Sequence, residues 1–81
     1  MNVVVFLFAA AKEAVGENQL EIELGDSSTL SELKFELLRR HPELKDICQQ
    51  SAFSVDHAYA TDDTVLNEGA EIGLIPPVSG G

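Results

Sequence analysis

The two most apolar segments of this 81-residue chain stand near its two ends, and a common fold has to accommodate both. Residues 3–8 are a continuous run of β-branched and aromatic residues, which is typical of a strand buried on both faces. Residues 71–75 read Glu-Ile-Gly-Leu-Ile and stop at a proline pair. Because such strands occupy sheet centres and crossover connections are right-handed, we expect the two segments to lie side by side and parallel.

A single amphipathic helix is predicted between these strands. Thr29 and Glu32 have the spacing of a capping box, in which each side chain binds a free backbone amide of the first turn. Pro42 prevents continuation, so the helix is expected to end near Arg40. The apolar stripe that it presents to a sheet consists of Leu30, Leu33, Leu37 and Leu38.

The remaining segments complete an α+β pattern. Residues 20–24 alternate strictly and predict a strand antiparallel to the first. Other expected elements are a helical turn or wide loop at 9–16, a short helical turn at 42–50, and short strands at 52–55 and 58–60. One helix can cover one face of such a sheet. The pattern predicts a β-grasp, ubiquitin-like fold: a mixed sheet of about five strands packed on one main helix, with a domain over residues 1–75 and an extended tail over 76–81.

The tail has an unusual composition. Residues 75–81 read Ile-Pro-Pro-Val-Ser-Gly-Gly, and no side chain is charged from residue 72 onward. Prolines stiffen the backbone and lack N–H donors, while the absence of a Cβ lets glycines enter narrow slots. Small residues also collect at frayed ends, but those are normally polar. The tail is therefore interpreted as a stiff strut that presents a slim carboxylate, on Gly81, as the reactive group.

Composition excludes several classes of function. Fourteen acidic residues against five Lys and Arg give a net charge of −9, which disfavours non-specific nucleic-acid and anionic membrane binding. Cys48 is the only cysteine, so no internal disulfide is possible, and with no signal peptide or membrane span apparent we expect a cytoplasmic protein. Cys48 is expected in the core. His41 and His57 lack the spacing of a zinc site, and there is no Gly-rich phosphate loop.

Over essentially its whole length the chain resembles the small subunits of molybdopterin synthase, the ubiquitin-like sulfur carriers of molybdenum cofactor biosynthesis. The matching positions are residues 5–9, Lys12, Glu13, Gly16, Leu30, Leu33, Val55, Tyr59, Asp63, Thr64, Leu66, Gly69, Glu71 and 75–81. The Pro-Pro-Val-Ser-Gly-Gly ending carries most weight, because other Gly-Gly sulfur carriers usually lack the proline pair. The chain departs at two turns, with Asp56 where Asn is common and Ala70 where Asp is common.

The resemblance implies a reaction cycle at the C-terminus. An E1-like adenylating enzyme uses ATP to join the Gly81 carboxylate to AMP, and a sulfur donor system converts the acyl adenylate to a thiocarboxylate. The large synthase subunit then accepts the tail, and sulfur passes to a cyclic pyranopterin monophosphate precursor to build the molybdopterin dithiolene. The resemblance further implies a heterotetramer of two small and two large subunits. No cofactor and no active site of its own are expected in this chain.

The resemblance also places the partner interface. Phe8, Tyr59 and Ile75 would lie on the sheet surface that docks the large subunit, although Phe8 and Ile75 are equally consistent with an ordinary core. Tyr59 is expected to be exposed, since aromatic residues with a polar tip suit interfaces. The tail residues would guide the carboxylate into the partner: Pro76, Pro77, Val78, Ser79 and Gly80.

Three other functions remain open from the sequence. A related carrier for thiamine synthesis or tRNA thiolation would share the terminal chemistry and dock a different acceptor, although the proline pair disfavours it. A ubiquitin-like modifier would be attached to target lysines through Gly81. A passive β-grasp interaction module would use neither glycine and would keep its activity when Gly80 and Gly81 are removed.

Overall fold

Nine short elements make up the fold of residues 1–76. The computed structural model describes residues 1–76. The elements along the chain are β1 (Asn2–Phe6), α1 (Ala9–Val15), β2 (Gln19–Glu23), α2 (Leu30–Arg40), a 3-10 turn (Pro42–Leu44), α3 (Lys45–Gln50), β3 (Ala52–Val55), β4 (Ala58–Tyr59) and β5 (Glu71–Ile75). From Pro77 onward the predicted tail lies outside the described residues. The predicted boundary between a domain over residues 1–75 and a tail over 76–81 therefore stays a prediction.

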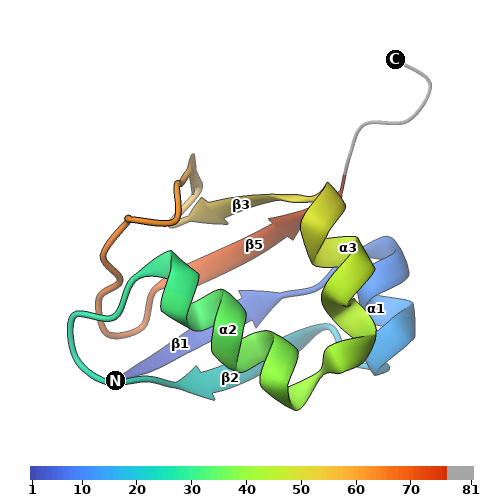
Figure 1. The fold of residues 1–81 in the computed structure, drawn as a ribbon, viewed down its shortest axis with the longest axis horizontal. Coiled ribbons are helices and arrows are strands. Elements are labelled where there is room, and N and C mark those ends of the chain that lie inside the picture. The colour runs from blue at the N-terminus through green and yellow to red at the C-terminus, as the bar shows by residue number, and fades with distance from the viewer. Residues whose placement is uncertain (77–81) are drawn as a thin grey trace.

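The predicted central pair of strands is present. The sheet order is β2-β1-β5-β3-β4, and β1 pairs in parallel with β5, with Val5 opposite Ile72 and Phe6 opposite Gly73. β2 runs antiparallel to β1, and β3 antiparallel to both β5 and β4. A five-stranded mixed sheet combined with helices confirms the α+β class and the β-grasp arrangement (Figure 1).

The core forms between one face of the sheet and the helices. α2 and α3 lie across this face, with α1 at the end of the sheet (Figure 1). Three of the four predicted leucines of α2 are fully buried, and Leu38 packs partly against them. The buried residues of the sheet face are Val3, Val5, Ile22, Phe53, Ile72 and Leu74. The predicted single main helix, α2, therefore supplies the centre of the core, and Leu44, Cys48 and Ala11 extend it at the edges.

The first strand corrects one prediction. Residues 3–8 were expected to be buried on both faces, yet Val4 and Phe6 are only half-buried and Phe8 is 52% exposed. β1 is central in the sheet, but the helices cover only one of its two faces (Figure 1). The second face carries apolar side chains that residues 1–76 leave open to solvent.

Local chemistry sets the ends of α2 as predicted. The Glu32 N–H donates to Thr29 Oγ1 at 3.3 Å, and Glu32 Oε1 accepts from the Thr29 N–H at 3.0 Å, which completes the capping box. The helix ends at Arg40 and Pro42 begins the 3-10 turn. The segment expected as a helical turn or wide loop is a helix, α1, which ends at Gly16 with φ +87°. Glycine adopts that left-handed conformation without the steric penalty of a Cβ.

Replacing Thr29 by Ala is expected to lower the free energy of unfolding by about 1 kcal/mol, because a first-turn amide loses its acceptor. Thr29→Ser keeps the hydroxyl and should remain close to the wild type. Urea denaturation followed by circular dichroism measures both variants. Equal stability of the Ala and Ser variants would show that the capping box contributes nothing.

Candidate docking face and C-terminal tail

The strand register aligns five residues in one row across the uncovered face of the sheet. Gln19 lies opposite Phe6, Phe6 opposite Gly73, Gly73 opposite Ser54, and Ser54 opposite Tyr59. Directly opposite residues share a face, and successive residues of a strand alternate between faces. Because Val5, Ile72 and Phe53 point into the core, the row points away from it. We call this surface the outer face.

The three residues predicted to dock a partner border two adjoining hollows on the outer face. Phe8 and Ile75 line a hollow of about 210 Å³, and Tyr59 and Ile75 line a second of about 290 Å³. Tyr59 is 78% exposed, as expected, and Ile75 is half-buried. For Phe8, exposed to 52%, the structure excludes the alternative of an ordinary core position. Their role in docking stays a prediction.

Five further residues of these hollows were not predicted: Phe6, Ser54, His57, Glu71 and Gly73. Two of them carried a signal in the sequence, because Phe6 is two residues before Phe8 and Gly73 two before Ile75, so each pair shares one side of its strand. Ser54 and His57 reach the site only through the pairing of β3 with β5 and β4, which no local pattern reveals.

A tight turn holds the β3–β4 hairpin against β5. Asp56 and His57 form the turn with φ of 50° and 72°, the positive values that a type I′ hairpin turn needs at both central positions. The Asp56 N–H donates to the Glu71 carbonyl at 2.8 Å, and Asp56 Oδ1 accepts from the Glu71 N–H at 2.9 Å. His57 Nε2 lies 3.3 Å from Glu71 Oε1. Through these contacts the turn anchors the hairpin, which carries Tyr59 on β4, to β5.

The tail begins next to the two hollows, at the end of β5. β5 ends at Ile75, which lies opposite Ala52 of β3, and the next residue, Pro76, is exposed. The other predicted tail residues lie outside the part of the chain that the structure describes: Pro77, Val78, Ser79, Gly80 and Gly81. The described part of the site is thus the surface from which the tail departs.

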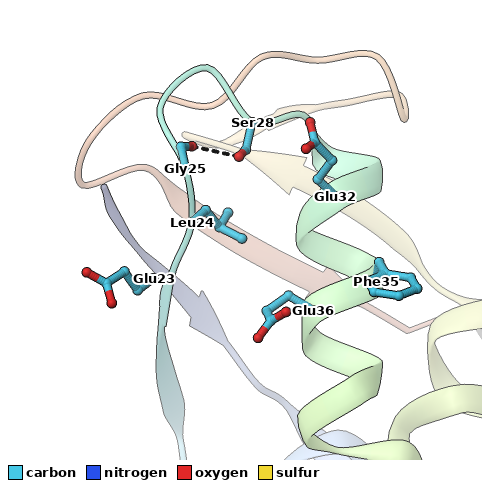
Figure 2. A pocket seen from close by; sticks show the side chains of 7 residues that line it. All are labelled: Glu23, Leu24, Gly25, Ser28, Glu32, Phe35 and Glu36. Carbon is cyan, nitrogen blue, oxygen red and sulfur yellow. Dashed lines mark hydrogen bonds between the residues drawn. The ribbon is translucent and has the colours of Figure 1, made fainter.

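A third hollow, of about 340 Å³, lies between the end of β2 and α2 (Figure 2) and shares no lining residue with the two hollows of the outer face. Two of its three carboxylates, those of Glu32 and Glu36, have partners. Glu32 completes the helix cap, and hydrogen bonds from Arg39, then Arg40, lower the pKa of Glu36 to about 2. Phe35 lies on the side of α2 away from β2 (Figure 2). Nothing in this arrangement favours acid–base chemistry.

The other residues weighed from the sequence have structural roles. Cys48 is buried, and burial raises the pKa of its thiol, which makes it a poor nucleophile. His41 Nδ1 lies 3.3 Å from Glu43 Oε2. Among residues 1–76 no three His, Cys, Asp or Glu side chains gather as metal ligands. Within the same range, no helix has both the length and the apolar character needed to cross a membrane.

Comparison with known proteins identifies the family. The model of the ThiS family matches residues 5–81. The chain belongs to the ThiS family. This ThiS-family chain is 32% identical to the molybdopterin synthase sulfur carrier subunit of Chlamydomonas reinhardtii over 83 aligned residues, which cover all of both chains. It is 35% identical to the human sulfur carrier subunit, covering 99% of this chain and 94% of the human one. The resemblance to the small subunits of molybdopterin synthase is thereby confirmed.

Solved structures agree with this family fold. SAMP1 from Haloferax volcanii superposes with a TM-score of 0.90 and complete coverage of both chains, and at 22% identity the likeness shows the fold alone. The complex of subunits 1 and 2 of the molybdopterin-converting factor from Helicobacter pylori contains a chain that matches with a TM-score of 0.75, 28% identity and complete coverage of both chains.

Asp56→Ala is expected to lower the free energy of unfolding by roughly 1–2 kcal/mol, because the Glu71 N–H loses its acceptor and Ala tolerates positive φ poorly. Asp56→Asn is the matched control. An amide oxygen still accepts the hydrogen bond and Asn adopts positive φ readily, so this variant should stay within about 0.5 kcal/mol of the wild type. Chemical denaturation measures the difference. Indistinguishable Ala and Asn variants would contradict the role assigned to this turn.

Proposed function

We propose that this chain is the sulfur-carrier subunit of a molybdopterin synthase. In this proposal the Gly81 carboxylate is adenylated, converted to a thiocarboxylate, and used to donate sulfur to a cyclic pyranopterin monophosphate precursor of the dithiolene. The observation that carries the proposal is the end-to-end match with molybdopterin synthase sulfur carrier subunits, in a chain that closes with Pro-Pro-Val-Ser-Gly-Gly.

The proposed chemistry needs little from the carrier beyond its terminal group. A carboxylate resists nucleophilic attack until one oxygen joins the α-phosphorus of ATP, which releases pyrophosphate and leaves an acyl adenylate. Hydrosulfide from the donor system then attacks the carbonyl carbon and displaces AMP, and loss of the S–H proton gives the thiocarboxylate. Its sulfur is a soft anion at neutral pH and a ready nucleophile toward the pterin precursor. The chain contributes reach and docking, and the partners contribute ATP binding and proton transfer.

Reach limits where a partner can bind. Five residues follow Pro76, and a fully extended chain of that length spans at most about 17 Å. A partner that takes Gly81 into an active site must therefore cover the surface close to Pro76. Ile75 and the two hollows occupy that surface. In the proposal Phe8, Tyr59 and Ile75 dock the partner, and residues 76–80 thread the tail into it.

The proposed partners follow from this cycle. The large synthase subunit binds the outer face, and the related complex of subunits 1 and 2 from H. pylori supports such a pairing. Two copies of each subunit would form a heterotetramer. An E1-like adenylating enzyme consumes ATP and a sulfur donor system supplies sulfur, so the carrier itself binds no cofactor. We place these reactions in the cytoplasm, where the single thiol of Cys48 stays reduced.

Intact mass spectrometry tests the reactive terminus. Incubation with ATP, sulfide and a cognate E1-like enzyme should replace one oxygen by sulfur on Gly81, and the C-terminal peptide should locate the change. A chain without Gly80 and Gly81 is the control and should stay unmodified. An unmodified wild-type chain would refute the carrier mechanism, and attachment of Gly81 to lysines of other proteins would favour a ubiquitin-like modifier instead.

Tyr59→Ala is expected to weaken binding to the large subunit about tenfold or more, because exposed aromatic anchors carry much of the energy of interfaces. Phe35→Ala is the matched control, since Phe35 is 73% exposed but lies on α2 on the other side of the sheet. Neither substitution removes a core contact, so thermal unfolding should change little. Isothermal titration calorimetry measures the affinities, and equal losses in both variants would contradict docking through the outer face.

A further inference from the structure

The smaller hollow of the outer face exists because residue 73 has no side chain. Gly73 stands in the middle of β5, the strand between β1 and β3, and glycine is disfavoured in strand interiors. A Cβ placed on Gly73 would lie 2.5 Å from Ser54 Oγ, closer than real atoms approach. The Ser54 hydroxyl therefore lies directly beside the position that a side chain of residue 73 would take, and together the two residues form a low floor.

Apolar walls surround this floor. Phe6 and Phe8 from the β1 end of the chain and Ile75 from β5 line the hollow of about 210 Å³. The two titratable residues of the lining, His57 and Glu71, lie 3.3 Å apart. A ligand group in the hollow would meet hydrocarbon walls and one hydroxyl, and the carboxylate of the lining already contacts His57. The chemistry favours an apolar side chain over a charged or strongly polar one.

We infer that this hollow receives one apolar side chain of the large synthase subunit, and that Gly73 and Ser54 determine partner specificity by keeping it open. The inference rests on the proposed function. Ile75 lines the hollow and precedes Pro76 directly, so a partner within reach of Gly81 covers the hollow as well. The centres of interfaces pack as densely as protein interiors. An empty void there is unfavourable, because the atoms that line it lose van der Waals contacts. A projecting apolar side chain of the partner fills the space.

The test adds a methyl group to the floor without disturbing the sheet. Gly73→Ala alone would clash with Ser54 Oγ, so its effect on binding would be ambiguous. Ser54→Ala removes the clashing oxygen. The nearest remaining atoms to a Cβ at position 73 are then the Cβ of residue 54 at 3.8 Å and Ile75 Cγ1 at 4.0 Å, which are ordinary contacts. The double variant S54A/G73A therefore fills part of the hollow, and S54A alone is its matched control.

Binding to the purified large subunit is measured for the wild type, S54A and S54A/G73A, with thermal unfolding and E1-dependent charging recorded in parallel. S54A supplies the reference affinity, because it lacks the same hydroxyl as the double variant. S54A/G73A should bind about tenfold or more weakly than S54A, because overfilling a packed site is destabilising, while its thermal unfolding and charging match those of S54A.

The outcomes separate this inference from the proposed function. Equal affinities of S54A and S54A/G73A would overturn the inference while leaving the carrier proposal intact. A double variant that loses charging by the adenylating enzyme but binds the large subunit normally would also overturn it, since the side chain in the hollow would belong to the other partner. A wild-type chain that fails to bind the large subunit at all would instead refute the proposed docking function.

Discussion

The parallel pairing of β1 with β5 is the constraint on which the rest of this structure depends. It sets Val5 beside Ile72 on the core face and Phe6 beside Gly73 on the outer face. A slip of one residue in either strand would exchange its faces, burying outer side chains and exposing core ones. The packing of the core under α2 therefore also specifies which residues meet on the outer face. The core and the proposed docking face share one register.

The same strand carries the tail. β5 is bonded to β1 on one side and to β3 on the other, so its displacement would break two ladders of hydrogen bonds. Its last residue, Ile75, lines both hollows, and Pro76 follows at once. A tail with a reach of only about 17 Å delivers its end accurately when its base does not move. A central strand provides that base, whereas an edge strand, with one ladder, opens more readily.

Much of the fold could be predicted from local chemistry. The pairing register of distant strands could not be predicted in this way. The cap at Thr29, the stop at Pro42 and the period of the leucines each act within a few residues, so the bounds of α2 followed from the sequence. Apolarity misled at residues 3–8, because it does not distinguish side chains that bury in the core from those that stay exposed. The positions of Ser54 and His57 in the hollows depend on how β3 pairs with β5 and β4. No local sequence pattern shows that pairing.

The net negative charge of the chain opposes the self-association that its exposed apolar surface would otherwise promote. The row next to that of Phe6 on the outer face reads Glu21, Val4 and Glu71, so carboxylates bound the apolar patch on the side away from the tail. Apolar patches promote self-association, but two copies of a chain with net charge −9 repel each other as they approach. A partner with basic groups opposite these glutamates would be attracted instead and aligned along the face. Net charge by itself indicates no particular partner surface, whereas the strand register places Glu21 and Glu71 where they can orient a partner on the outer face.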